Sequence, residues 1–375
     1  MNSNYNNLII IYGLPDTGKT SLGVKLNGVL PNSIRISTDT VTQEAIEKGI
    51  IPIPSNYAGN YCINIGDITI KLNKAFRKKL FELTISKIYQ GLFWNDSVIV
   101  CGYLFNFDGK TEIFNRFSNI CFIERFSDFK SKISINDITI EVDDVGIDNL
   151  VDAVKNAIKN NMIEQIIPQY HWYQNFDFLK TPSDSISKDK LVALMLPEDM
   201  HGSTVLDIGC NTGFFSIECA KRGASVVGID YFGKVIDLAN KIKNSIYFVN
   251  NIKFYEMNVG ENLNELGTFS HILMLSVIHY LDNQEDIIKR ILGILKPGGV
   301  LKLEMGIHPD KTVDTKIVNE KYYPTESKIK SILTNYTYTI NKSVDQGGDD
   351  IPRFVVSVIK EESREEWTIR ETYLI

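Results

Sequence analysis

The sequence predicts an α/β protein with two doubly wound parallel-sheet domains, and three observations support this. Short apolar runs alternate with segments of helical spacing along the 375-residue chain, as in parallel sheets covered by helices. Two glycine-rich turns, beginning near residues 13 and 209, each follow an apolar run. The length suits two domains of about 100–200 residues. We expect these domains at 1–160 and 190–360, with an aromatic linker at 161–189 that leads into the second domain and a charged tail at 361–375.

The expected elements follow the chain in order. In the first half, an apolar strand at 8–12 runs through the first turn into a helix that ends near residue 29. Further strands are expected at 33–37, 97–101, 119–123 and 138–142, and helices at 68–91 and 148–160. In the second half, helices are expected from about 189 and at 214–222, and strands at 204–208, 225–229, 252–257, 271–275 and 300–304.

The composition is that of an ordinary globular protein, with 43% hydrophobic and 23% charged residues. No stretch approaches the roughly 20 apolar residues of a membrane helix, and no basic segment precedes the first apolar run, so we expect no signal peptide. The five cysteines show neither a CxxC pair nor zinc-finger spacing. Scattered cysteines in an odd number suit a reducing compartment, which predicts a cytoplasmic location.

The charge distribution argues against a dedicated polynucleotide binder. Residues 1–160 hold 17 basic and 17 acidic side chains, which leaves 23 basic and 29 acidic for the remainder. Nucleic-acid-binding domains usually carry a basic surface. A small-molecule acceptor is therefore favoured over nucleic acid.

The first turn, GLPDTGKT from Gly13 to Thr20, fits the pattern GxxxxGK[ST] without a gap. Glycines let successive backbone N–H groups point at phosphate oxygens, and the following helix directs its positive end at the same anion. The lysine can reach the β- and γ-phosphates, and the threonine hydroxyl can hold Mg²⁺. The alternative is a chance strand–turn–helix. The pattern predicts a site for ATP and Mg²⁺ formed by Gly13, Asp16, Thr17, Gly18, Lys19, Thr20 and Ser21.

This half resembles the small P-loop kinases of the polynucleotide-kinase and adenylylsulfate-kinase type. By that resemblance, Asp39 at the end of the second strand would accept the acceptor's proton or bind Mg²⁺; alternatively, it caps a helix starting at Thr40. Arg125 would clamp transferring phosphates, or it is a solvated arginine at a strand end. Two departures are Cys101, where such families often carry an acid, and a short lid between Arg125 and Ile138.

The loop after the second strand, Pro52–Asp67, would cover the acceptor of the first domain. It leaves the edge of the sheet where ligands bind in open α/β folds. Its tyrosines, Tyr57 and Tyr61, are the predicted substrate-binding residues.

The second turn lies in Val205–Gly213, with the pattern hhDxGxxxG. This is similar to the first motif of the Rossmann-like class I S-adenosylmethionine-dependent methyltransferases. Glycines allow the backbone to approach a ligand closely. By the resemblance, Asp207 would bind the methionine ammonium, and Asp230, at the end of the next strand, would accept hydrogen bonds from the ribose hydroxyls. A nicotinamide site would need GxGxxG, which this turn lacks; an unoccupied turn is the structural alternative.

The resemblance extends to the family that contains the tRNA wobble-uridine methyltransferase and many small-molecule O-methyltransferases. Shared features are the aromatic WY pair, the LPxD run before VLDIGC, the GFFS turn, the segment Leu273–Tyr280, Glu304 and Tyr322–Thr325. The ring pair that usually ends Tyr-His is inverted here, as His279-Tyr280. The expected donor-binding residues of this half are Asp207, Gly209, Asn211, Gly213, Asp230, Tyr231, Asn258, Val259 and Ser276.

Three assignments carry alternatives. Asn258 could accept from the adenine amino group or form a loop. His279 could be the general base for an acceptor hydroxyl or a packing residue. An aromatic set could line the acceptor pocket or pack between domains; it comprises Tyr170, His171, Trp172 and Tyr173.

Together these features predict a bifunctional kinase and methyltransferase that modifies a small metabolite, a sugar or a phosphorylated precursor, by O-methylation. One alternative is an enzyme that processes or modifies RNA. Another is a methyltransferase whose P-loop domain only binds a nucleotide and regulates the chain.

Overall fold

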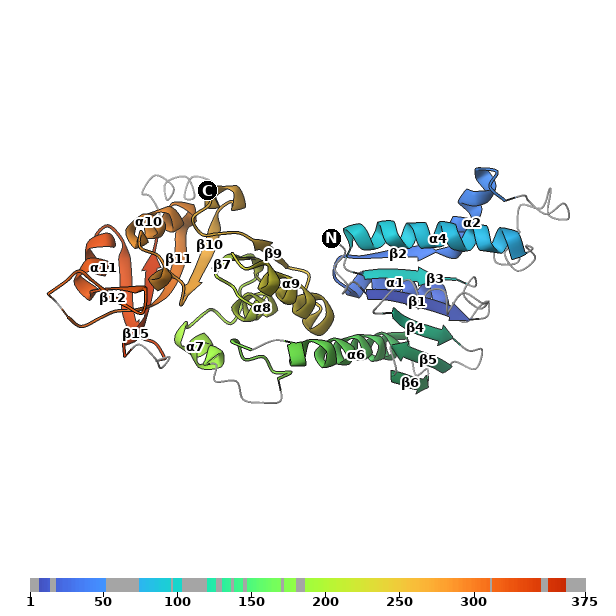
Figure 1. The fold of residues 1–375 in the computed structure, drawn as a ribbon, viewed down its shortest axis with the longest axis horizontal. Helices are drawn as coiled ribbons and strands as arrows, with labels where there is room; N and C mark the ends of the chain where they lie inside the picture. Colours follow the sequence, from blue (N-terminus) through green and yellow to red (C-terminus); the bar gives the residue numbers. More distant parts are fainter. Residues whose placement is uncertain are drawn as a thin grey trace, which may run out of the picture. The chain divides into compact units, whose positions relative to one another are not determined.

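The computed structural model describes residues 7–13, 18–51, 74–95, 97–102, 120–125, 130–135, 138–143, 147–169, 172–179, 186–310, 312–344 and 350–361. The chain divides into two compact units (Figure 1). The first comprises Met1–Pro168 with Asn244–Asn250, and the second comprises Gln169–Lys243 with Asn251–Ile375. Within the described ranges, no helix has the length and apolar character needed to cross a membrane.

The first unit contains a six-stranded mixed sheet in the order β2-β3-β1-β4-β5-β6. The first four strands in this order are parallel, and β5 and β6 add antiparallel at one edge. The C-terminal end of β1, where the first glycine-rich turn begins, therefore lies in the middle of the sheet. The strands are β1 (Asn7–Gly13), β2 (Ser33–Ser37), β3 (Ser97–Cys101), β4 (Ile120–Arg125), β5 (Lys130–Ile135) and β6 (Ile138–Asp143).

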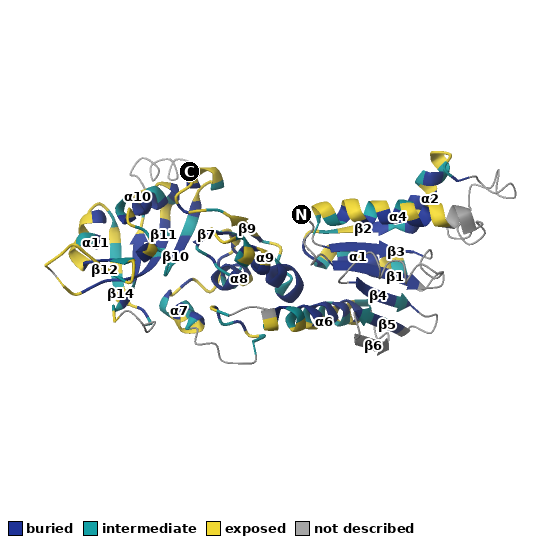
Figure 2. Cartoon of the chain, viewed as in Figure 1, coloured by how far each residue is buried: buried dark blue, intermediate teal, exposed yellow. Residues whose placement is uncertain are grey.

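Helices cover both faces of this sheet because its central strands are apolar on both sides. Alternate residues of β1 divide between the faces: Leu8 and Ile10 pack with α2 and α4, and Ile9 and Ile11 pack with α1 and α6. Figure 2 shows these strands as buried and the outer sides of the helices as exposed. The helices are α1 (Lys19–Val29), α2 (Thr38–Glu47), α4 (Lys74–Trp94) and α6 (Ile147–Ile166).

Four details of this unit differ from the sequence-based expectation. The segment expected as a lid contains β5, and the sheet is mixed rather than wholly parallel. The alternation in KSKISI, with Ile133 and Ile135 buried, is the pattern of a strand with one apolar face. Helix α6 also extends to Ile166, past the expected end at 160. Helix α2 begins at Thr38 with Ser37 at its N-cap, so Asp39 lies in the first turn and does not cap the helix.

The second unit contains a seven-stranded sheet in the order β14-β15-β11-β10-β7-β8-β9. Strands β7 to β11 are parallel and follow the order 3-2-1-4-5 of doubly wound sheets. Strand β15 is antiparallel to β11, and β14 is antiparallel to β15; neither was expected. The strands are β7 (Thr204–Ile208), β8 (Ser225–Asp230), β9 (Ile252–Glu256), β10 (Phe269–Leu275), β11 (Leu295–Gly306), β14 (Thr337–Lys342) and β15 (Arg353–Ile359).

One face of this sheet packs on α10 and α11, with apolar side chains such as Ile272 and Leu301 facing Ile288 and Ile291. A short hairpin, β12 (Thr315–Val318) and β13 (Lys321–Pro324), precedes α11. The helices are α7 (Ser187–Ala193), α8 (Phe214–Lys221), α9 (Gly233–Ile242), α10 (Gln284–Ile294) and α11 (Glu326–Ile332).

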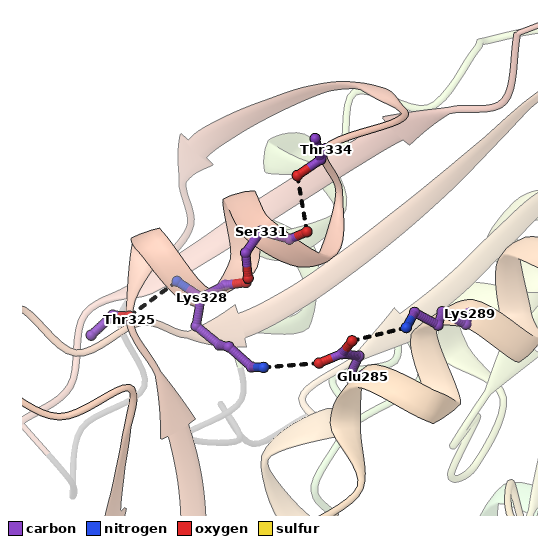
Figure 3. Close-up of polar contacts among 6 residues, drawn as sticks. All are labelled: Glu285, Lys289, Thr325, Lys328, Ser331 and Thr334. Carbon is purple, nitrogen blue, oxygen red and sulfur yellow. Dashed lines mark hydrogen bonds and ion pairs between the residues drawn. The ribbon is translucent and has the colours of Figure 1, made fainter.

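Polar contacts fix the start of α11 and tie it to α10 (Figure 3). The Thr325 hydroxyl accepts a hydrogen bond from the Lys328 N–H, which caps the helix. The Glu285 carboxylate pairs with Lys289 on its own helix and with Lys328 of α11, at 2.8 Å in each case. These two lysines lower the pKa of Glu285 to about 2.

Both units bury the cysteines that the structure describes. Cys101 and Cys121 lie in the first unit, and Cys210 and Cys219 lie in the second; all four are free thiols. Burial raises the pKa of Cys101 to about 11 and those of Cys121 and Cys219 to about 12, and it raises the pKa of Cys210 well above the usual value.

Candidate functional site

The second glycine-rich turn connects β7 to α8 at the carboxyl edge of the sheet. Gly209 and Gly213 have φ angles of 71° and 88°, in the left-handed region that favours glycine. A Cβ atom at Gly209 would overlap the Val277 side chain, and one at Gly213 would lie 2.6 Å from the Phe254 ring. The turn is held to β8 because the N–H groups of Gly209 and Cys210 both donate to the Ile229 carbonyl.

Two carboxylates flank this turn. Asp207 is buried and accepts a hydrogen bond of 2.7 Å from the Ser216 hydroxyl. Burial raises its pKa to about 6, and the Ser216 hydrogen bonds partly offset this. Asp230, at the end of β8, accepts from the N–H of Asn211 and from the N–H of Phe232, each at 3.0 Å. The two acids therefore bracket the point at which β7 runs into α8.

Gln174, a buried residue that the sequence analysis missed, holds this turn in place through three hydrogen bonds. Gln174 donates to the Cys210 carbonyl at 3.2 Å, and its side-chain oxygen accepts from the Thr212 hydroxyl at 2.7 Å and the Phe214 N–H at 3.1 Å. Its side chain is buried. The available signal was an amide directly after the aromatic pair Trp172-Tyr173, although its partners lie 36–40 residues further along the chain.

A cavity of about 620 Å³ opens beside the turn, which is within the usual range for a small-molecule site. It lies at the carboxyl ends of β7, β8 and β10, across the point where the strand order reverses, and this is where open α/β sheets bind ligands. The predicted donor-binding residues on its wall are Asp207, Gly209, Asn211, Asp230, Tyr231, Asn258, Val259 and Ser276. Gly213 is not on the wall; it starts α8.

Asn258 lines this cavity, and its side chain also shapes the loop. Its amide oxygen accepts from the Gly260 N–H at 2.8 Å, and its own N–H donates to Glu261. The loop-forming interpretation is therefore realised. A second lone pair of the same oxygen is left for a ligand.

The geometry of His279 disagrees with its predicted role as general base. The residue is buried, it is not on the cavity wall, and its Nδ1 lies 3.1 Å from Nη1 of Arg353. An arginine can only donate, so Nδ1 accepts this hydrogen bond. The ring also stacks on Tyr323 at 5.7 Å. His279 is thus a packing residue, and its neighbour Tyr280 lines the cavity.

The two described residues of the predicted aromatic set, Trp172 and Tyr173, have different surroundings. Tyr173 lines the cavity, whereas Trp172 packs edge-on against Phe176 and Phe178. Tyr170 and His171 lie outside the described residues. Of the described pair, only Tyr173 lies on the cavity wall.

A polar cluster reaches the wall of this cavity through Lys190 and Ser276. Nζ of Lys190 lies 2.7 Å from Oγ of Ser276, and this hydroxyl donates to Oε2 of Glu304 at 2.5 Å. Lys190 and Glu304 are buried and form an ion pair at 3.4 Å. Sequence reasoning assigned Ser276 to the donor and did not find Lys190, which lies on α7.

In the first unit, the glycine-rich turn runs from the end of β1 to the start of α1. Gly18 has a φ angle of 75° and immediately precedes Lys19, the first residue of the helix. Thr20 and Ser21 are exposed at this helix terminus. Asp16 and Thr17, and the loop tyrosines Tyr57 and Tyr61, lie outside the described residues.

The predicted acid lies within electrostatic reach of the lysine. Desolvation raises the pKa of Asp39, and the positive charge of Lys19 counteracts this. Cys101 lies at the end of the neighbouring strand and also interacts with Lys19 and Asp39. Its thiol stays protonated at neutral pH, so it does not replace a carboxylate. Among the described residues, no group of three or more His, Cys, Asp or Glu is arranged to hold a metal ion.

Arg125 is not the solvated strand-end residue of the alternative interpretation. Its side chain is 7% exposed, and Nη1 donates to the Ser131 hydroxyl at 2.6 Å. Nη2 would lie 3.3 Å from a Cβ atom at Gly18. The guanidinium therefore lies beside the turn that precedes α1.

Residues 206–301 match a family model described as a methyltransferase domain. Magnesium-protoporphyrin O-methyltransferase of Rhodobacter capsulatus is 33% identical over 103 residues, which are 25% of this chain and 42% of that protein. Ubiquinone biosynthesis O-methyltransferase of Rhizobium etli is 35% identical over 107 residues, 28% of this chain and 42% of that protein. The chain thus spans less than half the length of these curated relatives.

Solved structures are also similar to the chain. An S-adenosylmethionine dependent methyltransferase from Mesorhizobium loti has a TM-score of 0.38 and 17% identity, and the match covers 46% of this chain and 97% of that one. The family match coincides with β7 to β11 and with the turn and acids described above. Residues 206–301 of the second unit are therefore similar to methyltransferase domains, and they lie on a Rossmann-like α/β sheet.

Proposed function

We propose that the second unit transfers a methyl group from S-adenosylmethionine to a hydroxyl group of a small molecule. The observation that carries the proposal is the cavity at the carboxyl edge of β7, β8 and β10, with Asp207, Gly209 and Asp230 on its wall. The family match over 206–301 supports methyl transfer.

The residues present suit this donor. Asp207 is a buried carboxylate on the cavity wall, and a buried charge needs a partner of opposite sign, such as the ammonium of the methionine part. Asp230 can accept from ribose hydroxyls, the arrangement also used in dinucleotide sites. Gly209 lies on the cavity wall, and the absence of a side chain there lets Val277 pack closely against the turn.

When bound, S-adenosylmethionine supplies an electrophilic methyl group on a positively charged sulfur. The protein's own part is to bind and orient. Asp207 and Asp230 fix the two ends of the donor, and Gln174 holds the turn between them. Tyr173 and Tyr280 also line the cavity, and we assign the acceptor to these rings. Orientation of two reactants in this way lowers the entropic part of the barrier.

A small-molecule acceptor is supported by the size of the cavity and by the charge of the chain. A cavity of about 620 Å³ holds a donor with a small partner, and neither half of the chain is basic. The matched relatives are O-methyltransferases by name. We therefore favour O-methylation of a metabolite over modification of RNA.

We further propose that the first unit binds ATP with Mg²⁺ and phosphorylates the same or a related metabolite. Support comes from the strand–turn–helix around Gly18 and Lys19, the nearby Asp39, and the buried Arg125 beside the turn. In this role Lys19 and Arg125 would bind phosphate oxygens, Thr20 would hold Mg²⁺, and Asp39 would bind Mg²⁺ or accept the acceptor's proton. Cys101 favours the second candidate, a nucleotide-binding regulatory unit, because it stands where such kinases often have an acid.

The experiment is calorimetry with S-adenosylhomocysteine and, separately, with ATP and Mg²⁺, followed by metabolite profiling with labelled donors. Asp230→Ala should weaken binding of S-adenosylhomocysteine by about 1–3 kcal/mol, the scale of a lost hydrogen bond to a charged group. Asp237→Ala, an exposed acid on α9, is the matched control and should bind as the wild type does. Binding of NADH in place of S-adenosylhomocysteine would exclude the methyltransferase proposal.

A further inference from the structure

We propose that Ser276 and Glu304, held in place by Lys190, are the proton-accepting group of the methyltransferase cavity, and that they serve a hydroxyl group on an aromatic ring. The inference rests on the methyl-transfer function proposed above and names its base and its acceptor class. A base other than the predicted His279 is needed, because the His279 ring accepts a hydrogen bond from Arg353 and does not lie on the cavity wall.

The geometry places an accessible hydroxyl in front of a buried carboxylate. Ser276 lines the cavity directly after β10 and is half-buried, whereas Glu304 on the neighbouring strand β11 is 1% exposed. The Ser276 hydroxyl already donates to Oε2 of Glu304 at 2.5 Å. Ser276 has a φ angle of 57°, an unfavourable value for a serine, and such strain concentrates at functional sites.

The Glu304 carboxylate can accept more hydrogen bonds than the fold provides. Its second oxygen, Oε1, is buried without a hydrogen-bond partner among the described residues. A buried carboxylate oxygen left in this state costs free energy, which protonation of the group would relieve. Lys190 forms an ion pair with this carboxylate, which compensates its charge in the interior.

The charge of the cluster suits the acceptance of a proton. Lys190 and Glu304 together are neutral, and one added proton on Glu304 leaves a single positive charge on Lys190. That charge lies 2.7 Å from Oγ of Ser276, next to the acceptor oxygen as it becomes negative. A fixed charge at this point stabilises the developing oxyanion.

The transfer balances as follows. The acceptor O–H bond breaks as its proton passes to Oγ of Ser276, and the Ser276 hydroxyl proton passes to Oε2 of Glu304. The acceptor oxygen forms a bond to the methyl carbon, and the electron pair of the broken carbon–sulfur bond stays on sulfur. The carboxylate and the sulfonium both end uncharged, and no further reactant is needed.

The aromatic acceptor is inferred from the rings that face the cavity. Tyr173 and Tyr280 line it and are 47% and 60% exposed, and exposed rings gain most when another ring stacks on them or meets them edge-on. The other titratable groups on the wall are Asp207, Asp230 and Tyr231. Both acids already accept hydrogen bonds near the turn, on the side assigned to the donor.

The test uses 4-nitrophenol, whose anion absorbs visible light and whose neutral form does not. The full chain is first saturated with S-adenosylhomocysteine, and the probe is then added below the pH at which it ionises in water. Wild type should bind the probe as its anion. Ser276→Ala and Glu304→Gln should reduce the bound anion about ten-fold or more, each variant being compared with wild type after calorimetry has shown it to be saturated with S-adenosylhomocysteine.

The matched control is Glu285→Gln, which removes the same charge from the ion pairs with Lys289 on α10 and Lys328 on α11 and should behave as wild type. An equal anion band in Ser276→Ala, binding of the neutral probe only, or no binding at millimolar probe would each overturn the inference. If Glu304→Gln fails to fold by circular dichroism, Ser276→Ala decides alone, because it leaves the Lys190–Glu304 pair intact. Failure of the wild type to bind S-adenosylhomocysteine would instead refute the proposed function.

Discussion

Replacement of Gln174 by leucine should release the turn between β7 and α8. The substitution keeps roughly the side-chain volume but removes three hydrogen bonds, to the Cys210 carbonyl, the Thr212 hydroxyl and the Phe214 N–H. Each such bond contributes about 0.5–1.5 kcal/mol net, so we expect a total loss of about 2–4 kcal/mol. This corresponds to an open state of the turn that is about 30- to 1000-fold more populated.

Hydrogen exchange read by mass spectrometry over residues 205–216 measures that opening directly. Affinity for S-adenosylhomocysteine should fall in the same variant, because Gly209 and Asn211 lie in the released turn. Gln43→Leu is the matched control, since Gln43 is exposed on α2 and bonds only to Glu47 among the contacts described. If Gln174→Leu exchanged at the wild-type rate and bound normally, the three contacts would not be what holds the turn.

Three further predictions concern other parts of the chain. Burial raises the pKa of Asp207 to about 6, so the carboxylate becomes protonated as the pH falls through that value. Calorimetry should therefore show weaker binding of S-adenosylhomocysteine at about pH 5 than at about pH 7.5. The Asp207→Asn variant should not show this difference. The folded state holds this proton more tightly than the unfolded chain, so the contribution of Asp207 to stability should decrease as pH rises to about 6. Lys19→Ala should abolish ATP binding, measured with a fluorescent analogue, and leave S-adenosylhomocysteine affinity unchanged; equal loss of both would show that the substitution acts on the whole chain. Thr325→Ala removes the cap of α11 and should cost about 1 kcal/mol in urea unfolding, whereas Thr334→Ala, at an exposed helix end, should cost less.

The elements with strong local patterns could be predicted from the sequence. Strands β2 and β3 have the expected bounds because each is a short β-rich run between turn residues. The turn at Gly209 was predicted because its glycines follow a buried strand directly. Strands β5 and β14 were not, since four of the six residues of each are polar. Strand β15 is mostly apolar, but its pairing, like theirs, depends on neighbours in the folded sheet that no local pattern identifies.

Site residues with a local sequence pattern could also be predicted, whereas those that depend on distant partners could not. Asp207 and Asp230 could be located because both end strands on either side of one turn. The role of His279 depends on Arg353, which lies 74 residues later, and no local pattern reveals that partner. Lys190 and Gln174 were missed for the same reason, because the residues to which each one bonds lie far along the sequence, beyond at least one intervening strand or helix.

The buried thiols give the protein an internal measure of how often each unit opens. A thiol reacts with alkylating agents as its thiolate and only when solvent reaches it, and burial raises the pKa of all four described cysteines. Iodoacetamide should therefore label these residues only during transient unfolding. Because Cys101 and Cys121 report on one unit and Cys210 and Cys219 on the other, peptide mass spectrometry of one labelled sample would yield two separate opening rates. The addition of S-adenosylhomocysteine or ATP would then show, through the slowed pair, which unit each ligand protects.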